Sequence, residues 1–155
     1  MKFRSYQLLY VATLVLTVVA LLSPVVNFGE PNGAESVMTN FKYTAANGDV
    51  SWSVLALGIV LIFTALVNLF ALLVAMFNNF ELQKRVTILS MLLFAGYYIL
   101  FLVYTLVLSC GTSMDIELPM LYPFFGLTLN LFAFLLLRRA EAKIIAKALG
   151  FRLRD

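Results

Sequence analysis

Histidine is absent from this sequence, cysteine occurs once, and only 12% of the 155 residues are charged. These absences exclude a disulfide within one chain, a zinc site built from Cys and His, and a histidine general base. Cys110 ends a hydrophobic run with no basic residue close in sequence, so we interpret it as a small apolar side chain and not as a reactive thiol. Nucleotide-binding loops, paired-carboxylate sites and serine-nucleophile motifs are also missing. We therefore expect a protein without enzymatic activity, cofactor or metal.

Apolar side chains, by contrast, are abundant. Hydrophobic residues make up 63% of the chain and its mean hydropathy is +0.97, whereas a soluble domain has about 45–50% apolar and about 25% charged residues. The chain contains four runs without Asp, Glu, Lys or Arg, and each is long enough for a helix to cross the ~30 Å hydrocarbon core of a bilayer. These runs are Ser5–Gly29, Val50–Phe80, Val86–Met114 and Leu118–Leu137.

The four runs predict an all-α integral membrane protein, folded as a four-transmembrane-helix antiparallel bundle in a single domain over residues 1–155. Within lipid, every backbone N–H and C=O must be bonded inside a helix or a closed barrel, and the runs lack the polar–apolar alternation of barrel strands. The first run follows a basic start but no small-x-small cleavage site comes after it, so we expect it to remain as a span. The expected segments are spans at about 6–27, 52–78, 86–109 and 118–137, an outer loop at 28–51 and a tail at 138–155.

The distribution of Lys and Arg predicts the direction of the spans. When alternate connecting segments are assigned to the same side, every basic residue except Lys42 falls on one side of the membrane. Cytoplasmic segments carry the excess of Lys and Arg. We therefore expect both termini in the cytoplasm.

The expected outer loop, residues 28–51, contains a hairpin signal. β-prone residues flank Asn47-Gly48, and a type I′ turn needs positive φ at both of its central residues. We predict a short β-hairpin that lies on the outer mouth of the bundle, because an isolated hairpin is marginal in water. The loop either covers the bundle or forms a docking surface. Its candidate contact residues are Phe41, Tyr43 and Trp52.

In the tail, residues 138–155, basic residues recur at the spacing of one helix face. Arg139, Lys143 and Lys147 lie at i, i+4 and i+8, beside an apolar stripe that includes Ile144. This pattern predicts an amphipathic basic helix that continues the fourth span out of the membrane. Such a helix fits an anchor on anionic lipid or a contact for another protein, and topology accounts for its charge without nucleic acid. The candidate contact residues are Arg138, Arg139, Lys143, Lys147, Arg152 and Arg154.

The expected spans contain none of the ionisable residues that mark proton relays and substrate paths within membranes. Their most polar features are Asn68 in the second span, Tyr97 and Tyr98 in the third, and Asn130 in the fourth. Buried polar side chains in a membrane bundle typically bond across to a neighbouring helix. These four residues therefore either hold helices together or line a small polar cavity.

Three short stretches give the chain a resemblance to a known family. They are Met1-Lys2-Phe3-Arg4 with Gln7-Leu8-Leu9-Tyr10 before a Leu-rich span that ends at Pro24, then Phe80-Glu81-Leu82-Gln83-Lys84-Arg85-Val86, and finally Arg138-Arg139 through Arg152-Leu153-Arg154. In these stretches and in its whole layout the chain resembles a family of small Bacteroidota inner-membrane proteins catalogued as domain of unknown function 4293. It departs from the family pattern where Glu141-Ala142-Lys143 stands in place of an Asp-Glu pair. The resemblance implies four helices in a Gram-negative inner membrane and implies no activity.

The function expected from these features is binding. The chain lacks charged groups within its spans and presents two surfaces, the outer loop and the basic tail. We expect a non-enzymatic protein of the bacterial inner membrane that serves as an accessory, assembly or scaffolding subunit of a larger complex. Its partners would be the lipid bilayer and other inner-membrane proteins, without nucleic acid or metal. The alternative is a small transporter or lipid-handling protein with a polar cavity between its helices.

Overall fold

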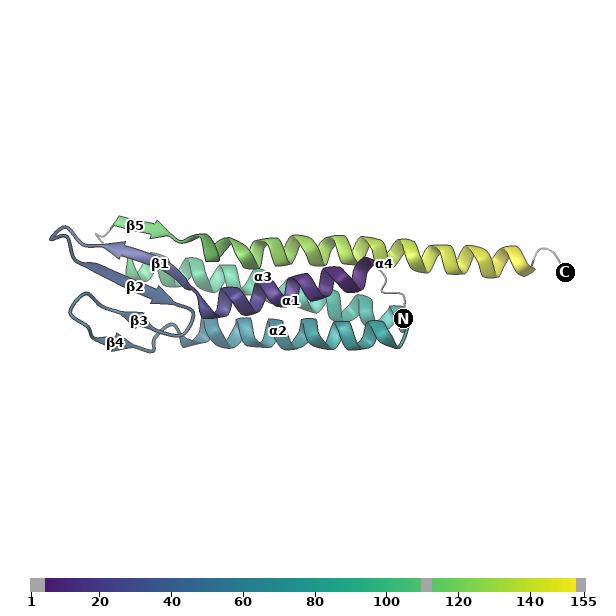
Figure 1. Ribbon diagram of the computed structural model, residues 1–155, viewed down its shortest axis with the longest axis horizontal. Helices are drawn as coiled ribbons and strands as arrows, with labels where there is room; N and C mark the ends of the chain where they lie inside the picture. Colours follow the sequence, from purple (N-terminus) through teal and green to yellow (C-terminus); the bar gives the residue numbers. More distant parts are fainter. Residues whose placement is uncertain (1–4, 110–112, 153–155) are drawn as a thin grey trace.

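The computed structural model describes residues 5–109 and 113–152, with side chains in the second range as far as Gly150. Its body consists of α1 (Ser5–Leu22), α2 (Leu55–Met76), α3 (Phe80–Leu108) and α4 (Tyr122–Arg152), as Figure 1 shows. Among the described residues, these four helices are long and apolar enough to cross a membrane. The structure is therefore mostly helical, with four helices whose length and composition suit a multi-pass membrane protein.

The helices follow one another around an antiparallel bundle. α1 packs against α2 and α4, and α3 packs against the same two helices, so α4 closes the ring. The turn between α2 and α3 is short because Asn78 adopts a positive φ of 56°, which asparagine tolerates better than most residues. Asn79 then caps α3 by accepting the Leu82 N–H at 3.1 Å.

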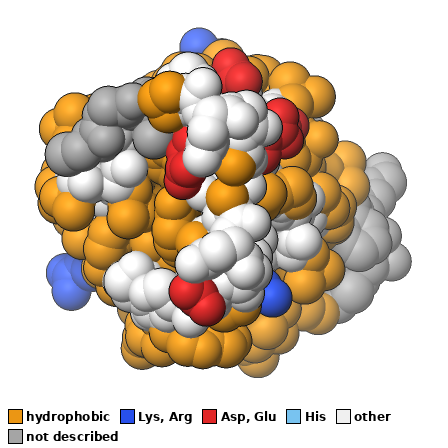
Figure 2. All heavy atoms as spheres, turned by 90° about the vertical axis from the view of Figure 1, so that its left-hand side faces the viewer, with side chains coloured by type: hydrophobic (Ala, Val, Ile, Leu, Met, Phe, Trp, Pro, Cys, Tyr) orange, Lys and Arg blue, Asp and Glu red, His pale blue; other side chains and the backbone are white. Residues whose placement is uncertain are grey.

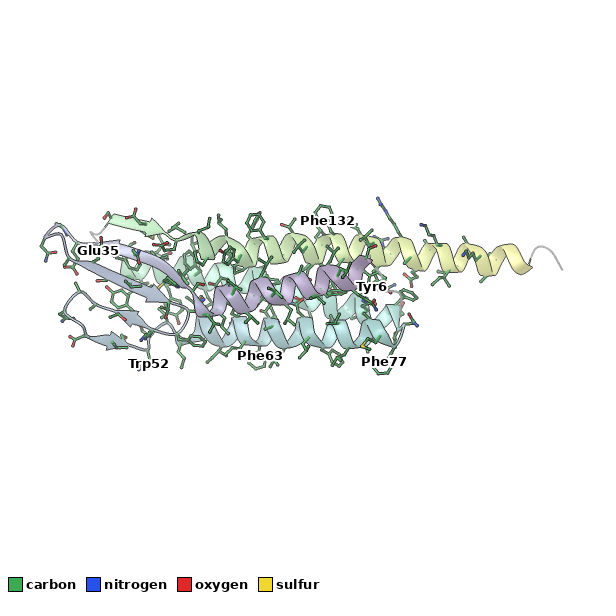
Figure 3. All side chains as sticks on the ribbon, viewed as in Figure 1. Tyr6, Glu35, Trp52, Phe63, Phe77 and Phe132 are labelled. Atoms are coloured by element: carbon green, nitrogen blue, oxygen red, sulfur yellow. The ribbon has the colours of Figure 1, made fainter. Side chains whose placement is uncertain are left out.

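Large apolar side chains point away from the bundle. Figure 3 shows Phe63 of α2 and Phe132 of α4 pointing outward on opposite sides, where their side chains are 57% and 54% exposed. The inward positions of α1 and α3 include several Thr, Ser and Tyr residues. This arrangement is typical of helices surrounded by lipid, where burying Leu gives no hydrophobic gain and small or polar residues form the helix contacts.

α1 ends earlier than the first expected span. That span was expected to cover residues 6–27, but the helix stops at Leu22 and strand β1 (Pro24–Gly29) follows. Pro24 has no N–H to donate to the Ala20 carbonyl one turn before it, so the helix cannot continue with regular bonding. That carbonyl instead accepts the side-chain amide of Asn40 at 2.7 Å and the Ser23 N–H at 3.4 Å.

The predicted hairpin is present as one edge of a larger antiparallel sheet. β3 (Tyr43–Thr44) and β4 (Val50–Ser51) pair as expected. They lie beside β2 (Glu35–Thr39), in the strand order β4-β3-β2-β1-β5. β5 (Ser113–Ile116) comes from the connection between α3 and α4 and pairs with β1. This strand was not predicted from the sequence.

The turn of the hairpin differs from the expected type I′ turn. Of the pair Asn47-Gly48, only Gly48 has a positive φ, at 91°. The Ala45 N–H donates to the Asp49 carbonyl at 2.8 Å, and the Gly48 N–H donates to the Ala45 carbonyl at 2.9 Å. This bonding closes a three-residue loop, residues 46–48, whose last residue is the left-handed glycine. Such loops are the most common hairpin connections after two-residue turns.

One face of the sheet packs against the end of α3. Val26, Phe28 and Met38 are fully buried there, in one apolar cluster with Tyr97 and Phe101. The sheet thus prolongs the bundle beyond the end of α1, as Figure 1 shows. We call this the sheet end of the molecule. We call the opposite end, where α4 extends beyond the other helices, the extension end.

The turn between β2 and β3 inserts into the mouth of the bundle. Asn40 is fully buried, and its Oδ1 atom accepts the Tyr97 hydroxyl at 2.7 Å. Beside it, Phe41 lies against Gly58 of α2, where an added Cβ would come within 2.5 Å of the Phe41 ring and 2.9 Å of the Asn40 carbonyl oxygen. Only glycine at position 58 leaves room for this turn.

We predict that Gly58→Ala destabilises the protein by about 1–3 kcal/mol, because the turn must move to avoid overpacking. Gly96→Ala is the matched control, since a Cβ there would meet no described atom within 4 Å beyond its own helix, and alanine favours the helix over glycine. Loss of helical circular dichroism during SDS titration in detergent measures both variants. Wild-type stability in Gly58→Ala would contradict this seating of the turn.

Candidate functional site

The bundle interior contains a polar layer to which three helices contribute. Asn68 of α2, Ser90 of α3 and Asn130 of α4 are fully buried. The Asn68 Oδ1 atom accepts hydrogen bonds from Ser90 Oγ and Asn130 Nδ2, both at 3.1 Å. Asn130 Nδ2 also donates to Ser90 Oγ at 2.7 Å. Because the three side chains bond directly to one another, no space remains among them for a ligand, and the layer ties α2, α3 and α4 together.

The remaining polar atoms of this layer are unequally satisfied. Asn68 Nδ2 donates to the Thr64 carbonyl of its own helix at 2.9 Å. Asn130 Oδ1 is buried and bonds to none of the described residues. An unpaired buried acceptor costs about 1–3 kcal/mol, so Asn130 Oδ1 is the weakest point of the layer.

A second polar contact joins α1 to α3 nearer the extension end. The Thr87 hydroxyl donates to the Gln83 carbonyl at 2.8 Å. The Tyr10 hydroxyl, which is bonded to the same Thr87 oxygen, must therefore be the donor in that contact. Gln83 has a fully buried side chain, and its amide lies close to the Tyr10 hydroxyl.

Tyr97 and Tyr98 do not reach the polar layer, so the four residues predicted to share one role are separated in space. Tyr97 bonds to Asn40, whereas the Tyr98 hydroxyl donates to the Met120 carbonyl at 2.9 Å. Met120 belongs to a short 3-10 helix, η1 (Leu118–Leu121), that precedes α4. Both tyrosines therefore fasten α3 to segments of the sheet end.

The aromatic contact candidates at the sheet end differ in exposure. Phe41 packs on Gly58, and Tyr43 is half-buried with its ring edge-on to Phe28 at 6.0 Å between centroids. Trp52 is 62% exposed, so it alone of the three candidates presents its ring. Figure 2 shows this end of the molecule, with acidic side chains among uncharged polar ones and apolar side chains around them. The acidic residues here are Glu30, Glu35, Asp49, Asp115 and Glu117.

At the extension end, α4 continues past the other helices, as Figure 1 shows. Glu141 accepts from Lys84 Nζ of α3 at 2.9 Å, and this hydrogen bond raises the pKa of Lys84 above its ordinary value. Every side chain of residues 142–150 is exposed. The candidate basic residues with described side chains are all exposed, namely Arg138, Arg139, Lys143 and Lys147. The Arg152 side chain, Arg154 and Cys110 lie outside what the structure describes.

Sequence reasoning missed several residues that form these contacts. Asn40 gave no signal, because a loop asparagine is ordinarily solvated and nothing local predicts its burial. Ser90 and Thr87 could have been found, since buried polar residues recur on α3 at spacings of three and four that define one helix face. From the sequence, Lys84 contributed only to the prediction of the direction of the spans. Its pairing with Glu141 depends on the packing of α3 against α4.

The layout agrees with a family match. The model of the family described as Domain of unknown function (DUF4293) matches residues 6–146. The chain belongs to this family. The match confirms the resemblance seen in the sequence. It runs from α1 into the exposed stretch of α4, so the bundle and the sheet lie within it. Among curated proteins, none matches the chain. The description of DUF4293 assigns no activity.

We predict that Asn68→Leu destabilises the bundle by about 1–2 kcal/mol, because it leaves the Ser90 hydroxyl and the Asn130 amide without their shared acceptor. Bonds of this kind in membrane bundles average about 0.6 kcal/mol each. Thr128→Val is the matched control, because the Thr128 hydroxyl bonds to the Phe124 carbonyl of its own helix. SDS titration measures both, and an effect of Asn68→Leu no larger than that of the control would refute the bridging role.

Proposed function

We propose that this DUF4293 protein crosses the bacterial inner membrane four times and serves as a non-enzymatic accessory, assembly or scaffolding subunit of a larger membrane complex. Its partners are then the lipid bilayer and other inner-membrane proteins. Both termini lie in the cytoplasm, and the sheet lies on the opposite side of the membrane.

The charges at the two ends support this orientation. The extension end carries Lys84, Arg85 and the basic residues of α4, whereas Lys42 is the one Lys or Arg among the described residues of the sheet end. Inner-membrane proteins keep the excess of Lys and Arg on the cytoplasmic side. The extension end is therefore the cytoplasmic one.

The apolar surface of the bundle matches the thickness of a bilayer. From Val86 to Leu108, α3 carries no charge and is about 33 Å long at ~1.5 Å per residue, against ~30 Å of hydrocarbon. Trp52 is exposed just before α2 begins, where an indole ring suits the headgroup interface. α1 is shorter, at about 27 Å, and the buried β1 residues Val25 and Val26 follow it toward the outer surface.

The observation that carries the binding role is the exposed stretch of α4. Beyond Glu141, Ile144 is 48%, Ile145 is 52% and Leu149 is 55% exposed. In the proposed orientation these side chains stand in water, where covering apolar surface gains about 25 cal/mol per Å². Exposed apolar side chains on a helix that extends beyond its bundle into water favour association with another protein.

A small transporter or lipid-handling protein is the second candidate. The fully buried Asn130 Oδ1, which bonds to no described residue, favours it, because such groups ordinarily hold water. The direct bonds among Asn68, Ser90 and Asn130 favour the packing role instead. An experimental structure with lipid or a chain of waters at this depth would decide for transport.

Two single-cysteine variants test the orientation, Asn47→Cys at the sheet end and Ala146→Cys at the extension end, both exposed positions and both in a Cys110→Ser background. We expect a membrane-impermeant maleimide to label position 47 in spheroplasts, and to label position 146 only after the membrane is opened. The reverse pattern would contradict the orientation, and labelling of both sites in sealed spheroplasts would contradict the four crossings.

Extraction of native membranes into polymer nanodiscs tests the accessory role. We expect the full chain of 17.3 kDa to elute in a larger particle with stoichiometric protein companions, identified by mass spectrometry. Ile144→Asp should remove these companions, because a carboxylate cannot be buried in an apolar contact without large cost. Trp52→Ala, at the other end, should leave them bound. A chain that elutes alone under several mild conditions would refute the accessory role.

A further inference from the structure

β5 forms one edge of the sheet and has a described strand on one side only. In the strand order β4-β3-β2-β1-β5, its neighbour is β1. All of its residues, Ser113–Ile116, are exposed. The open side of an edge strand presents unpaired backbone N–H and C=O groups, which are a template for a further strand. Which residues of β5 present these groups follows from the register of the ladder.

The backbone groups of Met114 and Ile116 point away from the sheet. The Glu117 N–H donates to the Val25 carbonyl at 3.0 Å, in the same antiparallel register that holds along β5. Hydrogen-bonded and non-hydrogen-bonded pairs alternate in such a ladder, so Asp115 also directs its backbone groups to β1. The N–H and C=O groups of Met114 and Ile116 therefore lie at the free edge, with one residue between them, as pairing with another strand requires.

The side chains of Met114 and Ile116 continue the core face of the sheet. They lie opposite Phe28 and Val26 of β1, and residues directly opposite each other in a sheet share one face. Phe28 and Val26 are buried against the bundle, whereas Met114 is 40% and Ile116 is 55% exposed. A strand added at the free edge would cover these two side chains with apolar residues of its own.

The other face of β5 is acidic. Asp115 is exposed and takes part in none of the ion pairs among the described residues. Glu117 accepts the neutral side-chain amide of Asn27 at 2.6 Å. Carboxylates outnumber Lys42 on the described part of the sheet end, as Figure 2 shows. Opposite charges on directly facing residues stabilise a strand pair and like charges destabilise it, so the charge of β5 favours an occupant with a basic residue opposite Asp115.

A second copy of the chain does not fit this edge. Copies in one membrane share an orientation, and β5 runs along the bundle (Figure 1), so two β5 strands side by side would be parallel. A two-fold axis along the membrane normal sets equivalent residues at the same height, whereas parallel strands bond with a stagger of one residue. The opposite edge strand, β4, has two residues, and Asp49 beside it would repel Asp115.

We propose that the free edge of β5 receives an extended segment of another protein as a further strand, with Lys or Arg opposite Asp115 and apolar residues opposite Met114 and Ile116. In recognition by strand addition, backbone bonds give affinity and alternate side chains give specificity. The inference rests on the proposed function, because it names the chemistry of one partner of the accessory subunit, on the side of the membrane away from the cytoplasm.

Photocrosslinking in native membranes tests the inference, with p-benzoylphenylalanine placed at position 116 on β5 or at position 50 on β4. Both positions hold exposed aliphatic side chains on edge strands of the same sheet, so position 50 is the matched control. We expect position 116, and not 50, to crosslink to a protein. The attached peptide, mapped by mass spectrometry, should contain Lys or Arg between two apolar residues.

Met114→Pro distinguishes strand addition from a contact of side chains alone. Proline removes an N–H that faces the free edge and none of those that bond to β1, and edge strands tolerate proline at such a position. We expect about tenfold lower crosslinking from position 116, as for a partner carbonyl left without its donor, and unchanged loss of helical circular dichroism during SDS titration. Met114→Leu, the control, should keep the crosslink.

Charge reversal tests the basic residue of the partner. Asp115→Lys should lower the yield from position 116 about two- to fivefold, as expected for one cross-strand ion pair. Asp115→Glu should keep it, because the carboxylate remains at the same position of the strand. Equal yields from the two variants would contradict the basic residue.

Other outcomes overturn the inference as a whole. Crosslinks from position 116 to lipid alone or to a second copy would each name a different occupant. Equal crosslinking from 116 and 50, an unchanged yield in Met114→Pro, or no crosslink would also overturn it. If companions still co-elute with the full chain in nanodiscs, such a result removes strand addition and leaves the accessory role standing. If neither a crosslink nor a companion is found, both fail.

Discussion

The carbonyl of Ala20 is the point at which the two parts of this fold depend on each other. α1 ends just beyond it, because Pro24 has no N–H to bond to this carbonyl, and the Ser23 N–H reaches it only at 3.4 Å. Asn40 supplies the shorter bond to the Ala20 carbonyl, at 2.7 Å, and in turn accepts the Tyr97 hydroxyl. One loop side chain therefore fixes the end of α1, the turn of the sheet and the position of α3, and Gly58 leaves room for that turn.

Elsewhere in the bundle, too, polar groups bond to one another in the interior, beside two clusters of buried apolar side chains. Tyr10 with Thr87, the layer around Asn68, and Tyr97 with Asn40 form successive polar contacts from the extension end to the sheet end. In water such an interior would be a poor core. In lipid it is what holds helices together, because apolar packing alone distinguishes weakly between a neighbouring helix and a lipid tail.

The two ends of the molecule have different relations to this bundle. The sheet is built into it, since the cluster around Phe28 and Met38 includes side chains of α1, α2 and α3. The exposed stretch of α4 is not, since its residues from 142 to 150, beyond the Lys84–Glu141 pair, are all exposed. That difference is why the proposed accessory role rests on the exposed stretch of α4, whereas the sheet offers a partner the free edge of β5.

The sequence by itself determined the four helices, the pairing of β3 with β4, and the helical continuation of α4, and it carried the resemblance to DUF4293. These features follow from local properties, such as the length of an apolar run, a turn signal, or the periodicity of basic residues along one helix. Only the tertiary structure decided that β5 pairs with β1, that Asn40 is buried, and that Tyr97 lies apart from Asn68 and Asn130. Each of these depends on a bonding partner distant in sequence, and no local pattern contains the position of that partner.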